Sequence, residues 1–182
     1  MADPMNEFIY IPSPHTTLGS EHHDGNITRA EIIAFLDALT VERKSFVTST
    51  DRVLQSDDLM VMKKDGRVVA LVGAKRLWGA PLVYLVVSST YYGIGYGYRL
   101  SQAGMPQARC LYPFLLAIIL NTNPSGIRLA RRLGFYPCLM TYKCHFLFMP
   151  LSWWGYLLYP LYAVCFPPWY WGYFFCKKQM FE

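Results

Sequence analysis

The chain has 182 residues, enough for one domain with a core of its own and little more. Only 16% of the residues are charged, whereas a soluble domain usually carries about one quarter, and 53% are apolar. The five cysteines form no C-x-x-C pair, which argues against a zinc site and for free thiols in a reducing compartment, the cytoplasm.

Charge is distributed unevenly along the chain. Residues 1–65 carry a net charge of −5 and residues 66–182 a net charge of +10. The basic half suits an anionic partner, namely a phosphate-bearing cofactor, a membrane surface or a nucleic acid. Nucleic acid ranks last of the three, because the aromatic residues are not interleaved with the basic ones. Residues 1–10 lack the basic start and the apolar stretch of a signal peptide.

The chain opens with a predicted short strand at residues 8–11 and a loop at residues 12–26. The loop contains residue types that can bind a metal: His15, His22, His23 and Asp24. Adjacent side chains rarely converge on one ion, so we interpret this segment as a solvated loop and predict no metal site.

Two helices are predicted next. Thr28 and Glu31 match a capping box, in which each side chain bonds the backbone N–H of the other residue, so a helix begins there. Its apolar face is formed by four residues at helical spacing: Ile32, Phe35, Leu36 and Leu39. Residues 41–54 indicate a second helix. The segment therefore supplies one amphipathic helix and a second, weaker one.

Three strands follow the helices. Residues 58–63 and 67–77 flank Lys64-Asp65-Gly66, which predicts a β-hairpin. Residues 78–81 indicate a second turn. Residues 82–87 carry no charge and are rich in β-branched side chains, which is typical of a buried central strand. The order up to this point is strand, two helices and three strands.

The segment Tyr92-Gly-Ile-Gly-Tyr-Gly97 then opens a helix, which Gly104 and Pro106 are expected to end. Residues 111–120 predict a further buried strand. Asn123 and Pro124 begin another helix that reaches Leu133 and is capped by Gly134. From Phe135 to about Phe148 the chain is expected to be extended.

A glycine-rich turn between a strand and a helix is typical of an anion site, because free N–H groups and the helix dipole point at the ligand. A tight turn without any ligand explains the three glycines about equally well. A Walker loop would need Gly-Lys-Ser/Thr, which the chain lacks. A Rossmann fingerprint would need a third glycine at Tyr98 and an acidic residue further on, and neither is present.

The glycine segment resembles motif A of the GNAT acetyltransferase superfamily, R/Q-x-x-G-x-G/A. Gly95 and Gly97 are in register, and Tyr92 stands where Arg or Gln is usual. Downstream, Asn123-Pro-Ser-Gly-Ile-Arg-Leu-Ala-Arg-Arg-Leu-Gly-Phe135 resembles the family's N-x-x-A-x-x-L-Y-x-K-x-G-F helix. The two motifs stand in the family's order and separation, and the resemblance covers roughly residues 8–143.

The resemblance implies an α/β (α+β) fold, with a mixed, mostly antiparallel central sheet flanked by helices and an apolar C-terminal extension. It also implies acetyl-CoA as co-substrate and an amine as acceptor. The backbone of the central strand would hold the pantetheine, the glycine turn would hold the pyrophosphate, and one asparagine would face the cofactor. The residues expected at acetyl-CoA are Leu85, Val86, Val87, Tyr92, Gly93, Ile94, Gly95, Tyr96, Gly97 and Asn123.

No catalytic acid or base is identified. Many family members use a tyrosine as the acid at the position of Ala130, and residues 66–181 contain no carboxylate side chain. The remaining candidates for proton transfer are Asp57, Asp58, His145, Tyr91, Tyr92 and Tyr136. The alternative to an N-acyltransferase is therefore a non-catalytic GNAT-like protein, for example a phage-encoded one, with a structural or binding role.

Beyond a domain at residues 1–143, residues 144–182 are predicted to form an aromatic, apolar tail. Residues 144–176 contain no Asp, Glu, Lys or Arg, and 14 of these 33 residues are aromatic. Prolines interrupt the stretch, and Trp and Tyr favour the headgroup zone. We therefore expect an interfacial or re-entrant membrane anchor ahead of a full span. Packing of the tail on its own domain or on a protein assembly remains open.

Overall fold

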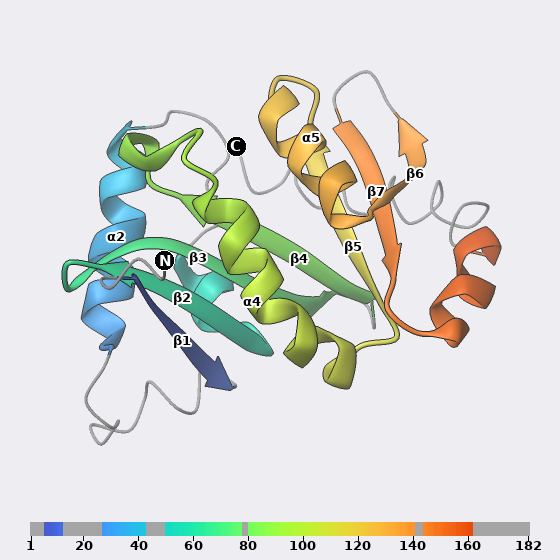
Figure 1. Ribbon diagram of the computed structural model, residues 1–182, viewed down its shortest axis with the longest axis horizontal. Helices are drawn as coiled ribbons and strands as arrows, with labels where there is room; N and C mark the ends of the chain where they lie inside the picture. Colours follow the sequence, from blue (N-terminus) through green and yellow to red (C-terminus); the bar gives the residue numbers. More distant parts are fainter. Residues whose placement is uncertain (1–5, 13–26, 43–49, 78–79, 141–143, 162–182) are drawn as a thin grey trace. The chain divides into compact units, whose positions relative to one another are not determined.

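The computed structural model describes residues 6–12, 27–42, 50–77, 80–140 and 144–161 (Figure 1). The chain divides into two compact units, Met1–Cys110 and Leu111–Glu182. The predicted boundary between a domain ending at residue 143 and a tail beginning at residue 144 falls inside the second unit. The loop histidines and two of the five cysteines, Cys165 and Cys176, lie outside the described residues, whereas Cys110, Cys138 and Cys144 are free thiols.

The first unit contains an antiparallel sheet in the order β1-β2-β3-β4. Its strands are β1 (Asn6–Pro12), β2 (Asp58–Lys64), β3 (Arg67–Leu77) and β4 (Ala80–Val87). Its helices are α2 (Arg29–Glu42), α3 (Thr50–Leu54) and α4 (Tyr96–Leu111), with a short 3-10 helix, η1, at Ser89–Tyr91. The predicted hairpin is confirmed, because β2 and β3 pair across a turn in which Asp65 and Gly66 have φ of 51° and 75°.

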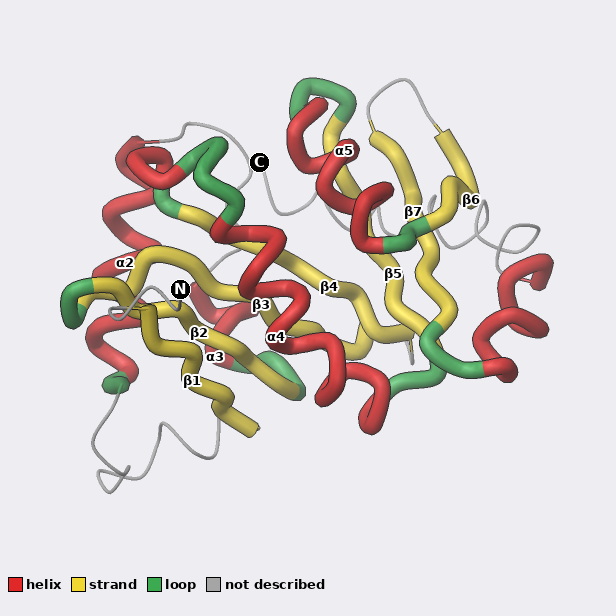
Figure 2. Tube along the Cα trace, viewed as in Figure 1, coloured by secondary structure: helices red, strands yellow, loops and turns green. Residues whose placement is uncertain are grey.

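Side chains of the first unit's strands alternate between the two faces of the sheet, as the two-residue period of a strand requires. Leu59, Val61 and Leu71 join a buried cluster with the predicted apolar face of α2. Their neighbours Met60, Met62 and Ala70 pack on the opposite side with residues of α4. Figure 2 shows α4 crossing in front of these strands. The sheet of this unit is thus covered by helices on both faces.

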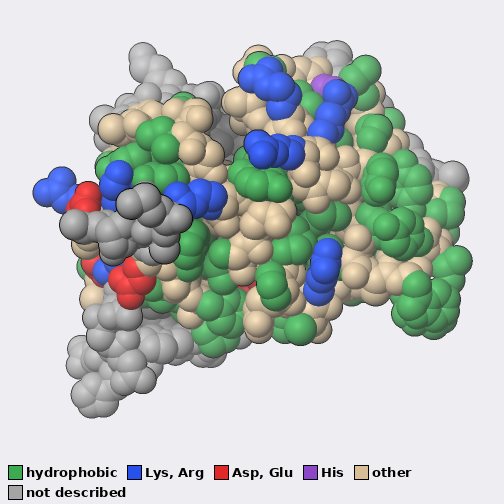
Figure 3. Space-filling model, viewed as in Figure 1, with side chains coloured by type: hydrophobic (Ala, Val, Ile, Leu, Met, Phe, Trp, Pro, Cys, Tyr) green, Lys and Arg blue, Asp and Glu red, His purple; other side chains and the backbone are tan. Residues whose placement is uncertain are grey.

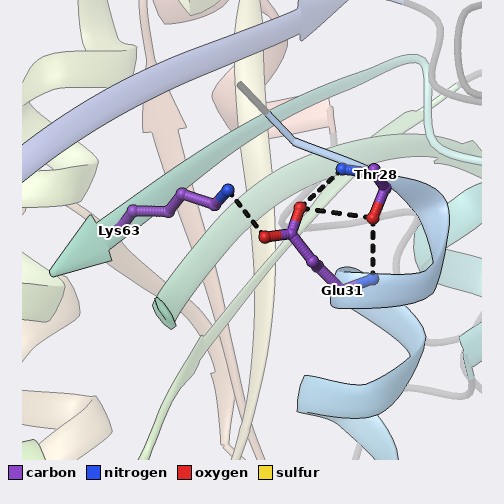
Figure 4. A network of polar contacts seen from close by, with 3 residues as sticks. All are labelled: Thr28, Glu31 and Lys63. Atoms are coloured by element: carbon purple, nitrogen blue, oxygen red, sulfur yellow. Dashed lines mark hydrogen bonds and ion pairs between the residues drawn. The ribbon is translucent and has the colours of Figure 1, made fainter. Parts of the chain in front are cut away.

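The capping box at the start of α2 is confirmed (Figure 4). The backbone N–H of Thr28 donates to Glu31 Oε2 over 2.7 Å, and the backbone N–H of Glu31 donates to Thr28 Oγ1 over 3.2 Å. The other carboxylate oxygen of Glu31 lies 2.7 Å from Lys63 Nζ. The helix is therefore fixed at its first turn to strand β2.

The prediction that Gly104 and Pro106 end the helix after the glycine turn is wrong, because α4 continues to Leu111. Proline removes one helical N–H, but α4 buries Leu100 and Ala108, and this packing outweighs the local propensity. A Cβ atom at Gly104 would lie 3.7 Å from Met60 Sδ, so the helix passes close to the sheet. The strand predicted to start at Leu111 consequently starts later, at Phe114.

The second unit is built around three antiparallel strands in the order β5-β7-β6. They are β5 (Phe114–Leu120), β6 (Tyr136–Met140) and β7 (Cys144–Pro150), and α5 (Pro124–Leu133) connects β5 to β6. The start of α5 at Pro124 and its cap at Gly134, with φ of 97°, are as predicted. The single extended run predicted from Phe135 is in fact two strands that pair with one another.

Candidate functional site

The glycine turn connects the end of β4, through η1, to the first residue of α4. Its four turn residues are Tyr92–Gly95, and α4 begins at Tyr96. Gly93 and Gly95 have φ of 78° and 92°. L-residues with a side chain rarely adopt this left-handed region, so these two glycines are required by the backbone path.

The middle of the turn offers unpaired N–H groups to its surroundings. Among the described residues, no acceptor pairs with the backbone N–H groups of Gly93, Ile94, Gly95 or Gly97. The first three of these residues are exposed, and a Cβ atom built on Gly93 or Gly95 would meet nothing within 4 Å. The turn therefore has both the donors and the space that an anion at a helix N-terminus needs.

Both ends of the turn are held by backbone hydrogen bonds. On the entry side, the N–H of Ser88 donates to the carbonyl oxygen of Val69 over 2.9 Å. The N–H of Tyr92 donates to the carbonyl oxygen of Ser89 over 3.1 Å. On the exit side, the N–H of Arg99 donates to the carbonyl oxygen of Gly95 over 3.0 Å and starts the helix. The donors in the middle are thus presented by a fixed backbone frame.

The sequence analysis missed one residue beside this turn. The rings of Tyr91 and Tyr96, which flank the turn, are stacked with their centroids 5.4 Å apart. Lys64 Nζ, at the end of β2, lies 5.6 Å from the Tyr91 centroid and 5.8 Å from the Tyr96 centroid. Lys64 is about 30 residues distant in sequence, and only the pairing of β2 with β3 and of β3 with β4 brings it here.

The strand residues expected at the cofactor lead directly into the turn. Leu85, Val86 and Val87 are the last residues of β4 and pair with β3 through Val72, Leu71 and Ala70. Val86 is buried among the α2 cluster, while Leu85 and Val87 pack on the α4 side with Tyr96. The segment from Leu85 to Gly97 is therefore one continuous piece of the first unit.

Asn123 belongs to the second unit and serves as the N-cap of α5. Its Oδ1 atom accepts hydrogen bonds from the N–H of Gly126 and the hydroxyl of Ser125, both over 2.9 Å. Gly126 packs so closely that a Cβ atom there would lie 2.8 Å from Asn123 Nδ2. The side chain has a local structural role, and its approach to a cofactor stays a prediction.

Two of the candidate bases bond to the backbone of β3. Asp58 Oδ1 accepts the N–H of Ala74 over 3.0 Å, and Asp57 Oδ2 accepts the N–H of Arg76 over 2.9 Å. These hydrogen bonds join the start of β2 to the neighbouring strand β3. Both carboxylates are therefore already engaged with the backbone of β3, and their part in proton transfer stays a prediction.

The remaining candidates for proton transfer are spread over both units. Tyr91 is half-buried and Tyr92 exposed in the first unit, while Tyr136 on β6 and His145 on β7 belong to the second. Ala130, at the family's tyrosine position, is buried, and its carbonyl oxygen accepts the N–H groups of Gly134 and Phe135. No side-chain group at that position can donate a proton.

A model of the Acetyltransferase (GNAT) family matches residues 31–135, which is more than half of the chain. The chain belongs to the GNAT family. The resemblance read from the two sequence motifs is thereby confirmed, and so is acetyl-CoA as the co-substrate that this family uses. The matched residues run from the first turn of α2 to the residue after α5, so they include the whole glycine turn.

Solved structures share the GNAT fold. A GNAT-family acetyltransferase from Streptococcus pneumoniae is 13% identical with a TM-score of 0.57, over 79% of this chain and 99% of that one. The ribosomal-protein-S18-alanine N-acetyltransferase from Escherichia coli is 13% identical with a TM-score of 0.59, over 81% and 95%. The yncA protein from Salmonella typhimurium, solved with its cofactor acetyl-CoA, is 18% identical with a TM-score of 0.55, over 71% and 93%. No curated protein sequence matches the chain. At these identities the likeness establishes the mixed α/β fold alone.

The start of the predicted aromatic tail is part of the second unit's sheet. Residues Cys144–Pro150 form β7, in which Phe146 and Phe148 are buried, and Phe148 stacks on Phe114 with centroids 5.1 Å apart. A helix follows at residues 153–161. No helix in the described part of the GNAT chain is both long and apolar enough to cross a membrane.

The helix at residues 153–161 has an inner face fixed to its own unit and an apolar outer face. On the inner face, Gly155 is buried beside Pro113 and Pro150, and the Tyr159 hydroxyl donates to the carbonyl oxygen of Pro137 over 2.9 Å. Figure 3 shows hydrophobic side chains gathered over this helix. The residues that are more than half exposed are Trp153, Trp154, Tyr156, Leu157 and Leu161.

Proposed function

We propose that this GNAT protein transfers an acetyl group from acetyl-CoA to the nitrogen of an amine. The observation that carries the proposal is the exposed row of unpaired N–H groups in the glycine turn between β4 and α4. Unpaired backbone donors at two left-handed glycines and a helix N-terminus suit a diphosphate, which has many acceptor oxygens and negative charge. The last residues of β4 precede the turn in the chain and would bind the pantetheine.

The proposed reaction forms a bond between the acceptor nitrogen and the acetyl carbon and breaks the thioester bond to sulfur. The amine must be neutral to attack, and the departing thiolate takes up a proton. Asp57 and Asp58 bond to β3, and Ala130 supplies no hydroxyl. The proposal therefore rests on orientation of the two substrates, which alone lowers a barrier by several kcal/mol, with water carrying the protons.

Isothermal titration calorimetry of the full chain with acetyl-CoA tests the proposal. The full chain is needed because ending it at residue 143 would delete β7 from the sheet of the second unit. We expect binding at micromolar to millimolar acetyl-CoA, followed by release of free thiol when a panel of primary amines is added. No binding at millimolar acetyl-CoA would refute the enzyme and the CoA-binding function together.

A non-catalytic GNAT protein is the second candidate, favoured by the loss of the usual tyrosine at Ala130. Such a protein would bind acetyl-CoA in the same titration but release no thiol with any amine. Mass spectrometry of acetyl-CoA mixed with protein and amine distinguishes the two outcomes, because only the enzyme adds an acetyl group to the amine. Thiol release without an acetylated amine would indicate thioester hydrolysis and would contradict amine transfer.

Membrane association would act through the outer face of the helix at residues 153–161. Trp153 and Trp154 are stacked with centroids 3.9 Å apart and stand 61% and 57% exposed. Tryptophan favours the headgroup zone of a bilayer, and large exposed apolar patches mark interaction surfaces. The proposal is an interfacial contact in which this face lies on the membrane and the inner face stays on the protein.

Flotation with phosphatidylglycerol-containing vesicles tests the contact. We expect the full chain to float and the double variant Trp153→Ser/Trp154→Ser to stay in the soluble fraction. Met140→Ser is the matched control, because Met140 is 69% exposed on β6 and outside the helix. Equal flotation of the double variant and the full chain would exclude this face as the membrane contact.

A further inference from the structure

We propose that Lys64, from the β2–β3 hairpin, binds the diphosphate of acetyl-CoA at the glycine turn. The inference rests on the proposed acetyl-CoA site and assigns it a cationic ligand. Motif A usually carries Arg or Gln at the position of Tyr92, so the turn of this chain has no guanidinium or amide side chain there. Lys64 supplies a positive charge from a different element of the fold.

The position of Lys64 is defined by the two rings that flank the turn. Tyr91 precedes the four turn residues and Tyr96 follows them. The Lys64 ammonium lies within 6 Å of both ring centroids, at 5.6 Å and 5.8 Å. Aromatic faces attract cations at this distance without neutralising their charge. The ammonium is therefore held beside the turn and keeps its capacity to bind an anion.

The pairing of strands β2, β3 and β4 determines where Lys64 lies relative to the glycine turn. Lys64 pairs with Arg67 at the closed end of β2 and β3, and Ala70 pairs with Val87 at the end of β4. Strand β2, which carries Lys64, and strand β4, which precedes the turn, are thus both paired with β3 in one antiparallel sheet. Strand pairing fixes such backbone distances more firmly than a loop does, so the backbone of Lys64 is preorganised beside the turn.

The charges around the turn favour the same assignment. A hydrogen bond with the Tyr96 side chain raises the pKa of Lys64 and so favours the charged ammonium further. Arg99 is a second cation at the same ring, with Cζ 6.0 Å from the Tyr96 centroid. Asp65 in the hairpin turn also raises this pKa, and its single negative charge is outnumbered by Lys64 and Arg99. Two cations beside unpaired N–H groups form a site for a phosphate-bearing ligand.

A purely structural role for Lys64 makes a different prediction. If the ammonium only held the two tyrosine rings, its loss would lower stability and would weaken all ligands of the site by the same factor. If it binds the diphosphate, its loss weakens only ligands that carry phosphate. The comparison of acetyl-CoA with S-acetylpantetheine, which lacks the diphosphate and the nucleotide, separates the two roles.

The experiment is calorimetric titration of the full chain and of Lys64→Met with both ligands, at low and high salt. Lys64→Met keeps the length and most of the apolar stem of the side chain and removes the charge. Lys64→Arg restores a cation. Lys75→Met is the matched control, because Lys75 lies on β3 and bonds to Gln55 over 2.8 Å, away from the turn. Thermal melts of every variant verify that each is folded.

We expect Lys64→Met to bind acetyl-CoA about tenfold or more weakly, as loss of a charged hydrogen bond implies. Its affinity for S-acetylpantetheine and the affinities of the Lys75→Met control stay unchanged, and Lys64→Arg recovers most of the loss. The affinity of Lys64→Met also depends less on salt than that of the unaltered chain.

Equal acetyl-CoA affinity of Lys64→Met and the unaltered chain would overturn the inference while leaving the proposed function intact. An equal loss for acetyl-CoA and S-acetylpantetheine, or an unchanged salt dependence, would likewise assign Lys64 a structural role. Failure of the unaltered chain to bind acetyl-CoA is a distinct result, which refutes the proposed function and the role of Lys64 with it.

Discussion

Glu31 Oε1 lies 2.7 Å from Lys63 Nζ, so a single carboxylate both caps helix α2 and pairs with strand β2 (Figure 4). The Lys63 side chain is 11% exposed and that of Glu31 36% exposed. The ion pair is therefore partly shielded from water and joins two elements that pack through the α2 cluster. Its removal affects both the helix terminus and the contact between helix and sheet.

Two substitutions at Glu31 separate these contributions. Glu31→Ala removes the cap and the ion pair and should lower the free energy of unfolding by about 1–2 kcal/mol. Glu31→Gln keeps an acceptor for the Thr28 N–H, as glutamine also completes a capping box, and should cost about 0.5 kcal/mol. Urea denaturation of both variants measures the difference. Equal losses would mean that the cap contributes nothing.

The same carboxylate predicts a pH dependence. Partial burial would raise the pKa of Glu31, but hydrogen bonds from Lys63 and Thr28 outweigh it and hold the pKa below the ordinary value of 4.5. A lowered folded-state pKa contributes stability that is present above the unfolded value and lost as pH falls through the folded one. The stability difference between the unaltered chain and Glu31→Gln should therefore persist at neutral pH and vanish under acidic conditions.

Comparison of urea midpoints at neutral pH and well below pH 4.5 checks this prediction. The other carboxylates titrate alike in both proteins, so their effects cancel in the difference. A difference that stays constant over this range would show that the charge of Glu31 does not contribute to folding.

The sequence predicted those parts of the fold that local patterns determine. The capping box at Thr28, the hairpin turn at Asp65 and the cap at Gly134 each depend on residues only a few positions apart, and all three are confirmed. The course of α4 through Gly104 and Pro106 was missed, because its stability comes from packing on β2 and β3. Local propensity carries no information about such contacts.

The candidate site likewise contains features that the sequence predicted and features that it did not. The glycine turn is visible in the sequence, because positive φ values restrict the choice of residue to glycine. The contact of Lys64 with Tyr91 and Tyr96 is not visible, since it depends on the register of two strand pairs. The structural role of Asp57 and Asp58 was also missed, because the N–H groups that donate to their carboxylates lie on β3, distant in sequence.

Gly95→Ala tests whether the shape of the turn matters for the cofactor. An alanine at φ of 92° is strained by about 1–2 kcal/mol, although its Cβ atom would meet nothing within 4 Å. We expect the turn to relax to another conformation and the affinity for acetyl-CoA to fall about tenfold. Calorimetric titration measures this effect.

Gly134→Ala is the control for that substitution. Gly134 has φ of 97° and equally open surroundings, but it caps α5 in the second unit. The two variants should lose similar stability in thermal melts, while only Gly95→Ala loses affinity. Loss of acetyl-CoA binding in both would mean that general destabilisation, rather than the turn, explains the result.

Gly73→Ala should destabilise the first unit by overpacking. A Cβ atom there would collide with the Tyr84 hydroxyl and lie 2.7 Å from the carbonyl oxygen of Asp58. The hydroxyl cannot move freely, because it is hydrogen-bonded to Ser56, which in turn donates to the carbonyl oxygen of Val53 over 2.6 Å. We expect a loss of about 1–3 kcal/mol in denaturation experiments.

A double-mutant cycle with Tyr84→Phe identifies the cause of that loss. Removal of the hydroxyl relieves one of the three close contacts, so Gly73→Ala should cost less in the Tyr84→Phe background than in the unaltered chain. The carbonyl oxygen of Asp58 and the ring carbon Cζ of residue 84, each 2.7 Å from the built Cβ, remain, so part of the cost persists. Strictly additive effects would exclude the Tyr84 hydroxyl contact as the reason.

The strand order β5-β7-β6 has a consequence for biosynthesis. Because β7 is the last of the three strands to be translated, β5 and β6 emerge from the ribosome before the strand that joins them. Their backbone edges facing that gap stay unpaired until residue 150 has been released, and unpaired strand edges invite association with other chains. Premature termination within residues 144–150 should therefore yield aggregation-prone nascent chains.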